Sequence, residues 1–254
     1  MPFFLIPTRE PGILIEDSSN IYITGKVGGD FDSRRTQENN DVQEDEEEID
    51  YDYASAKRGI IDGHGSEYWG IPLVGYVQLG EFRPDLFALN RTENVLIEYM
   101  LFRDAALYTL HLNDMNGLKI RYVSVVARRT HYDGHSFMDL SAFNTDGIDV
   151  SGTNVHIHDV DIWNQDDCIA VKDAPQMEVS SNMLFERVTA SGLGLTIGSI
   201  GGTTVQNITF RDSLLYKSYK GIYMKFRPDV WRTTPGLIED VLFENITMIE
   251  PEQW

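Results

Sequence analysis

A short phrase recurs along this chain: Asn or Asp, an apolar residue, a variable residue and a second apolar residue. The alternation of apolar and variable residues predicts a β-strand that buries one face. The most closely spaced phrases follow one another after roughly two dozen residues, a period typical of a solenoid built from stacked coils. The phrases begin at Asn20, Asn94, Asn154, Asn182, Asn207 and Asp240, with a looser copy at Gly117.

A single coil of this kind cannot bury its apolar face, whereas stacked coils bury it between them. No Asn-Gly or Asp-Gly turn joins two successive phrases, so we expect their strands to pair in parallel across coils. Asparagine suits a turn, and stacked asparagines are expected to form a ladder of amide hydrogen bonds. The predicted fold is an all-β solenoid with one domain over residues 1–254. The last phrase runs almost directly to Trp254, so we expect C-terminal coils to be missing.

The charge of the chain restricts its partners. The formal net charge is −19, which argues against nucleic acid because phosphate binding requires a basic face. Nine acidic residues and no basic one lie between Glu38 and Asp52, which predicts a solvated acidic loop insertion over 38–52. No run of 18 apolar residues is present, so no membrane span is expected, and we see no signal peptide. We expect a monomer.

Carboxylates gather in two segments, Asn144–Val150 and Asn164–Val171. The step from Asp146 to Asp166 is close to the length of one coil, so a parallel solenoid brings them side by side on neighbouring strands. Asp167 joins them if a turn or bulge swings it to the same side. Close carboxylates raise one another's pKa, which lets one serve as a general acid while another serves as a base. Ordinary turn chemistry and a calcium site are the alternative readings.

Several ordered segments of the chain resemble glycoside hydrolase family 28, the polygalacturonases and their relatives. The acidic segments resemble the family patterns N-T/S-D-G-x-D and D-D-C. Residues 192–202, Gly-Leu-Gly-Leu-Thr-Ile-Gly-Ser-Ile-Gly-Gly, resemble G-H-G-L-S-I-G-S-x-G-G, and Gly221-Ile-Tyr-Met-Lys-Phe resembles G-V-R-I-K-T. The resemblance covers about residues 60 to 250. It implies a right-handed parallel β-helix that hydrolyses α-1,4-galacturonan, an acidic polysaccharide of pectin, with inversion and without a cofactor or metal.

The resemblance also implies a role for individual residues and a place of action. Asp166 is expected to protonate the glycosidic oxygen, while Asp146 and Asp167 hold and activate the water. Lys225 is expected to bind a substrate carboxylate. The resemblance further implies that the protein acts outside the cell. The residues expected to orient the acids are Asn144 and Gln165.

Two departures from the family pattern bear on the substrate. Leu193 stands where the family has histidine, and Tyr223 stands where it has the arginine that grips a uronate. Tyr223, Lys225 and Arg227 alternate along one expected strand, so we expect all three on the substrate side and Arg227 to replace part of the missing charge. A hydrolase of rhamnogalacturonan or of a decorated pectin, and an inactive polysaccharide-binding β-helix, therefore stay open as alternatives.

Two other pairs of residues invite an interpretation. His156 and His158 lie two apart on one expected strand face, but a metal site would need a third ligand and the sequence does not indicate one. Lys172 and Asp173 follow the strand that contains Cys168, and we expect them to form an ion pair of small energy at the rim.

Overall fold

A computed structural model describes residues 10–25, 58–70, 83–128, 142–227 and 235–253. The acidic segment 38–52 lies outside these residues. The predicted single domain over 1–254 also includes segments that are not described, so it stays a prediction. The described residues share one continuous apolar core, which extends from Leu86 to Leu215 and takes in partly buried residues on either side.

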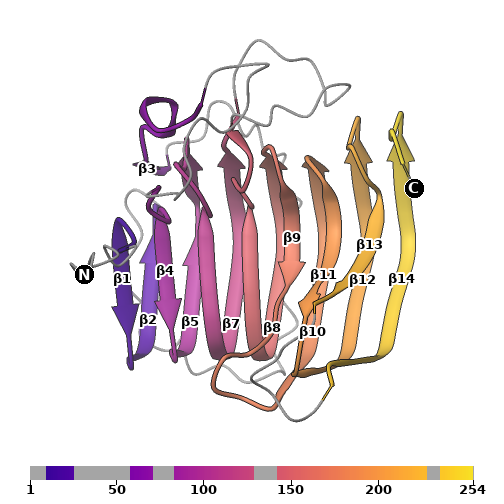
Figure 1. Ribbon diagram of the computed structural model, residues 1–254. Coiled ribbons are helices and arrows are strands. Elements are labelled where there is room, and N and C mark those ends of the chain that lie inside the picture. The colour runs from indigo at the N-terminus through magenta and orange to yellow at the C-terminus, as the bar shows by residue number, and fades with distance from the viewer. Residues whose placement is uncertain (1–9, 26–57, 71–82, 129–141, 228–234, 254) are drawn as a thin grey trace, which may run out of the picture.

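The described chain consists almost entirely of β-strands, and its coils follow one another from β1 at one end of the stack to β14 at the other (Figure 1). One short 3-10 helix, η2 (Gly65–Glu67), interrupts them. The strands are β1 (Ile13–Glu16), β2 (Ser19–Thr24), β3 (Gly59–Asp62), β4 (Phe87–Asn90), β5 (Glu93–Glu98), β6 (Met100–Arg103), β7 (Leu110–Val126), β8 (Ile148–Trp163), β9 (Asp167–Val171), β10 (Val179–Ser191), β11 (Gly194–Ile200), β12 (Thr204–Tyr216), β13 (Ile222–Phe226) and β14 (Leu237–Ile249).

Every pairing between these strands is parallel and joins one coil to the next, as a right-handed parallel β-helix requires. Leu96 of β5 pairs with Lys119 of β7, one coil further along the chain. Leu184 of β10 pairs with His156 of β8 in the preceding coil and with Thr209 of β12 in the following coil. The paired positions repeat with the spacing of the sequence phrases, so the predicted solenoid and its period are confirmed for these coils.

The predicted asparagine ladder runs along one corner of the helix. Its members adopt the left-handed backbone conformation, with φ between 53° and 59° for the asparagines. Nδ2 of Asn207 donates to Oδ1 of Asn182 at 2.8 Å, and Asn182 donates to Asn154 at 3.5 Å. Because Gly117, the looser copy of the phrase, has no side chain, Nδ2 of Asn154 donates to Oδ1 of the preceding residue, Asn116, at 3.2 Å.

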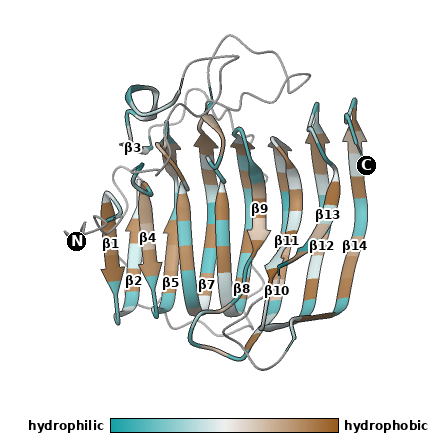
Figure 2. Ribbon diagram, viewed as in Figure 1, coloured by the Kyte–Doolittle hydropathy of each residue, from teal (hydrophilic) through white to brown (hydrophobic). Residues whose placement is uncertain are grey.

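Equivalent residues of successive coils also stack inside the helix. The rings of Phe185 and Phe210 lie 4.4 Å apart between centroids, and those of Phe210 and Phe243 lie 4.9 Å apart, nearly parallel in both cases. Such ring pairs stabilise a core by about 0.5–1.5 kcal/mol beyond the burial of their area. Figure 2 shows the underlying pattern, apolar and polar residues alternating along the long strands.

A short sheet made of β9, β11 and β13, joined to the start of β8, forms one wall of the coils. Ile148, Ile169, Leu195 and Ile222 stand in one column across these strands. Each member of this column belongs to a different coil, so the residues next to the column in the sequence come from four successive coils. None of the described helices is long and apolar enough to cross a membrane.

Candidate active site

Of the three predicted acids, Asp146 and Asp166 line a cavity of about 700 Å³, and Asp167 is buried beside them. Asp146 stands two residues before β8, and Asp166 and Asp167 stand at the start of β9. One carboxylate oxygen from each of the three lies within 4.8 Å of the others. The register of β9 with β11 shifts next to Asp167, which is the irregularity needed to bring two adjacent aspartates to one place.

Asp166 is buried beside the cavity. Burial, followed by the charges of Asp146 and Asp167, raises the pKa of its carboxyl to about 8. Two main-chain N–H groups donate to it, that of Asn144 at 2.9 Å and that of Asp167 at 2.8 Å. Asn144 thus contacts Asp166 through its backbone, and its expected role in orienting the acids stays a prediction. A carboxyl that keeps its proton near neutral pH has the property a general acid needs.

Asp167 is completely buried and receives donors from two further coils. Oγ1 of Thr196 donates to its Oδ1 at 3.0 Å, and the hydroxyl of Tyr223 donates to the same oxygen. Nζ of Lys225 donates to Oδ2 at 2.9 Å. Side chains from two further coils therefore surround Asp167, whereas Asp166 accepts from backbone N–H groups.

Asp149 and Lys172 belong to the site, although the sequence reasoning assigned no chemical role to Asp149. Nζ of Lys172 lies 3.3 Å from Asp146, 3.2 Å from Asp149 and 3.7 Å from Asp167. Burial and then Asp149 raise the pKa of Asp146 well above its ordinary value. Burial also raises the pKa of Asp149, to about 6, while Lys172 opposes that rise.

The expected rim pair of Lys172 and Asp173 is wrong. Adjacent side chains of an extended segment diverge, so Lys172 reaches the aspartates while Asp173 takes other partners. Oδ2 of Asp173 accepts from Nη2 of Arg227 at 3.1 Å. Its carboxylate also accepts from the backbone N–H of Gly201 at 2.9 Å and from that of Thr203 at 3.2 Å.

The three residues expected on the substrate side, Tyr223, Lys225 and Arg227, all line the cavity. Each also has an acidic partner within the protein: Tyr223 and Lys225 contact Asp167, and Arg227 contacts Asp173. The side chain of Arg227 is 58 % exposed and that of Lys225 is 35 % exposed, so both present charge to the solvent of the cavity.

Leu193 and Gln165 lie next to the aspartates but contact them less directly. Leu193 lines the cavity with an apolar side chain, and its main-chain N–H donates to the carbonyl of Asp166 at 2.7 Å. Gln165 is buried, and its main-chain N–H donates to Oγ1 of Thr145 at 3.1 Å. In this structure Gln165 supports the segment before β8, and its expected role in orienting the acids stays a prediction.

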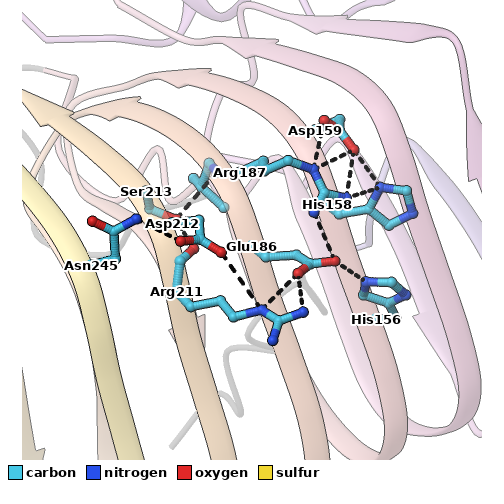
Figure 3. A network of polar contacts seen from close by, with 10 residues as sticks. His156, His158, Asp159, Glu186, Arg187, Arg211, Asp212, Ser213 and Asn245 are labelled. Carbon is cyan, nitrogen blue, oxygen red and sulfur yellow. Dashed lines mark hydrogen bonds and ion pairs between the residues drawn. The ribbon is translucent and has the colours of Figure 1, made fainter. Parts of the chain in front are cut away.

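The two histidines lie in a separate network on β8, β10 and β12 (Figure 3). Nε2 of His156 contacts Glu186 at 3.0 Å, and Nδ1 of His158 contacts Asp159 at 2.5 Å. Arg187 and Arg211 complete the ion pairs. Each histidine thus has its own carboxylate, and among the described residues the three aspartates of the cavity are the group arranged closely enough to hold a metal.

A wall of parallel coils that presents clustered aspartates to a cavity is the arrangement of a β-helix glycosidase family. The chain belongs to the glycosyl hydrolases family 28, whose sequence model matches residues 12–252. The resemblance of the acidic segments and of the segments around Leu193 and Tyr223 is therefore confirmed at the level of the family.

Two similar proteins come from Aspergillus species. The probable endopolygalacturonase I of Aspergillus terreus is 30 % identical over 198 residues, which cover 76 % of this chain and 48 % of the relative. Endopolygalacturonase I of Aspergillus aculeatus is 29 % identical over 193 residues, which cover 74 % and 46 %. The chain thus spans about half the length of the relatives it matches.

Solved structures share the fold. Endopolygalacturonase I from Stereum purpureum, complexed with two galacturonates, gives a TM-score of 0.59 at 24 % identity, covering 74 % of this chain and 51 % of that one. The endo-xylogalacturonan hydrolase of Aspergillus tubingensis gives 0.63 at 21 % identity, covering 75 % and 49 %. At these identities the likeness supports the β-helix fold.

Proposed function

We propose that this protein hydrolyses the α-1,4-galacturonan backbone of pectin. The observation that carries the proposal is the contrast between two adjacent carboxyls. Asp166 is buried, with a pKa raised to about 8, while Asp167 is held by Thr196, Tyr223 and Lys225. A carboxyl that keeps its proton near neutral pH, beside a second carboxyl in a different environment, is what acid-assisted cleavage of a glycosidic bond requires.

In this mechanism Asp166 gives its proton to the glycosidic oxygen as the bond to the anomeric carbon breaks. Asp146 accepts a proton from the water that attacks that carbon. Asp146 lines the cavity, and one of its oxygens lies within 4.8 Å of an oxygen of Asp166 and of an oxygen of Asp167, so the proposed base stands next to the proposed acid. Asp167 supports this water and stabilises the positive charge that develops on the sugar.

Inversion at the anomeric carbon is proposed from the family relationship. The closest oxygens of the three aspartates lie nearer together than the roughly 6.5–9.5 Å between carboxyl groups that is usual for inverting glycosidases. Proton NMR of the fresh product measures the outcome directly. A first product with the β-anomer supports inversion of the α-linkage, and a first product with the α-anomer contradicts it.

The substrate carboxylate is expected to meet Lys225 and Arg227, the exposed cations of the cavity. A second substrate class is favoured by a specific observation. Tyr223 stands in the place of the family arginine and gives its hydroxyl to Asp167, so one cation of the usual uronate clamp is missing. A hydrolase of rhamnogalacturonan or of a decorated pectin is the alternative that this change supports.

The test is release of reducing ends from de-esterified polygalacturonan and, in parallel, from rhamnogalacturonan. Wild type is compared with Asp166→Asn and with the control Asp212→Asn, an aspartate of the outer network. Release that disappears in Asp166→Asn and persists in the control supports the hydrolase and identifies its polymer. No release from either polymer by a protein with a β-type circular dichroism spectrum refutes it and favours the polysaccharide-binding alternative.

We also propose that the protein acts outside the cell as a monomer on an acidic polysaccharide. The family relationship supports the location, and the net charge of −19 disfavours nucleic acid as a partner. Light scattering tests the monomer, since a mass near twice 28.9 kDa contradicts it. Detection of the protein in cell extracts alone, with none in the medium of its native source, contradicts the location.

A further inference from the structure

One partly buried ammonium group contacts three of the four aspartates of the site. Nζ of Lys172 approaches Oδ2 of Asp146, Oδ2 of Asp149 and Oδ2 of Asp167 within 3.7 Å. Its side chain is 21 % exposed and lines the cavity, while all three carboxylates are buried. Among the described residues Asp166 has no ion pair, so the lysine divides the aspartates into a paired group and a single unpaired acid.

The contacts also fix which oxygen of each carboxylate is free. Lys172 takes Oδ2 of Asp146 and Oδ2 of Asp149, and the Oδ1 atoms of both are buried with no partner among the described residues. An uncompensated pair of buried carboxylates would take up protons, because burial disfavours the charged form. The position of Lys172 therefore bears both on the charge of Asp146 and on the orientation in which its carboxylate is held.

We propose that Lys172 is a positioning residue that keeps the Asp146–Asp149 pair negatively charged and fixes the orientation of the Asp146 carboxylate. The inference rests on the proposed hydrolase activity. It adds a role for Lys172 and Asp149 in keeping Asp166 as the acid and Asp146 as the base. Burial lowers the pKa of the Lys172 ammonium, and Asp149 and Asp146 outweigh this effect, so the lysine stays charged throughout the working range. Asp149 acts through Asp146 and Lys172 without touching the substrate.

Other groups around the lysine do not supply the same charge to Asp146. Lys225 donates to Oδ2 of Asp167 at 2.9 Å, the oxygen that Lys172 approaches at 3.7 Å, and among the described residues it has no ion pair with Asp146. His111 contacts Asp85 at 2.8 Å, and the ring of Tyr108 lies 5.8 Å from Nζ of Lys172. Besides the aspartates of the cluster, the titratable and charged groups among the described residues that line the cavity with Lys172 are Tyr108, His111, Asp173, Lys220, Tyr223, Lys225 and Arg227.

The experiment compares the pH dependence of kcat/KM in wild type, Lys172→Met and Lys172→Arg, with Lys217→Met as the matched control at the outer end of β12. Removal of the cation is expected to move the acidic limb of the profile upward by about one pH unit or more, because a neighbouring opposite charge shifts a carboxyl by that much. Lys172→Arg is expected to restore most of the limb. A rise in KM with an unmoved limb overturns the proposal, since it marks Lys172 as a substrate contact.

A double variant separates charge from packing. Asp149→Asn in the Lys172→Met background removes one negative charge together with the positive one, so the acidic limb is expected to return part of the way. A purely structural role for Lys172 predicts that the second substitution adds further loss, and that result overturns the proposal. The same variant serves if Lys172→Met alone does not fold.

A readout without substrate keeps this inference apart from the proposed function. The carboxyl carbons of aspartate are titrated by NMR in wild type and Lys172→Met, after assignment by Asp146→Asn and Asp149→Asn. We expect the Asp146–Asp149 pair to titrate at higher pH in Lys172→Met. Unchanged titration overturns the inference even in an active enzyme, whereas a clear shift in a protein that cleaves neither polymer leaves it standing and counts against the hydrolase.

Discussion

The hydroxyl of Tyr223 donates a hydrogen bond to the carboxylate of Asp167 across two coils of the helix. Nζ of Lys225 donates to the other oxygen of the same carboxylate at 2.9 Å. Tyr223, which stands at the position of the arginine in the family pattern, thus contacts a carboxylate of the site. Tyr223 is one of the residues that distinguish this chain from the family pattern. Its contact with Asp167 therefore connects this departure directly to the acids of the site.

Loss of the Tyr223 hydroxyl is expected to reduce catalysis by about 10-fold or more, because a hydrogen bond to a charged group contributes roughly 1.5–3 kcal/mol. Tyr223→Phe keeps the ring and removes only the donor. The measurement is kcat on the polymer that wild type cleaves. Tyr216→Phe, on β12 outside the cavity, is the control and should match wild type. Equal activity of both variants would show that the Asp167 contact has no catalytic role.

Asp166→Asn is expected to lower kcat by roughly 10²–10⁴-fold, the usual contribution of a general acid. The amide has nearly the same shape, so the fold is expected to remain. A substrate with a good leaving group, such as an aryl glycoside of galacturonate, should lose much less rate than the polymer, because its leaving oxygen needs little protonation. An equal loss on both substrates would argue against the acid role.

The buried proton of Asp166 also predicts how stability depends on pH. The folded carboxyl keeps its proton up to about pH 8, whereas the unfolded one releases it near pH 4, so raising the pH between these values favours unfolding. Asp166→Asn removes this effect. Its Tm should therefore exceed that of wild type at pH 7 by several degrees, with the difference vanishing toward pH 4. A constant difference across this range would contradict the raised pKa.

Arg227→Ala is expected to raise KM several-fold and to leave kcat nearly unchanged, because the side chain is exposed at the rim and touches none of the three acids. Its ion pair with Asp173 holds it over the backbone amides of Gly201 and Thr203. Steady-state kinetics on galacturonan measure the effect, with Arg187→Ala in the outer network as the control. A selective fall in kcat would place Arg227 in the chemistry instead.

The asparagine ladder predicts an ordered set of stabilities at one position. Asn182 has a φ of 56° and bonds to Asn207 at 2.8 Å. Asn182→Ala is expected to cost about 1–2 kcal/mol, because alanine is strained in the left-handed conformation and lacks the hydrogen bond. Asn182→Gly loses the bond without the strain and should lie between alanine and wild type. Urea unfolding measures the order, and glycine as destabilising as alanine would contradict it.

Much of the fold was predictable because each coil of a solenoid repeats the same sequence pattern, so the period of the pattern gives the length of a coil. The phrases at Asn154, Asn182 and Asn207 state the length of each coil, and the pairing of β8, β10 and β12 follows that count. The proximity of Asp146 and Asp166 was predictable for the same reason, since their separation in the sequence is close to the length of one coil.

The partners inside the site were less accessible to sequence reasoning. Whether Lys172 points into the cavity depends on the shift of register beside Asp167, and a shift of one residue exchanges the two faces of a strand. Asp149 did carry a signal, because it lies three residues after Asp146 in the same acidic segment. The inward turn of Tyr223 depends on the burial of Asp167, which only the packed coils reveal.

The column Ile148, Ile169, Leu195 and Ile222 fixes the distance between neighbouring strands at the site. Because Asp146 and Asp167 flank neighbouring members of this column, their backbones are set apart by the spacing of paired strands, about 4.8 Å. The main-chain N–H of Gly147 donates to the carbonyl of Asp167 at 2.9 Å and fixes that spacing. Loops that leave and rejoin the coils can therefore lengthen, shorten or change sequence over evolution while the separation of the two carboxylate-bearing backbones stays the same.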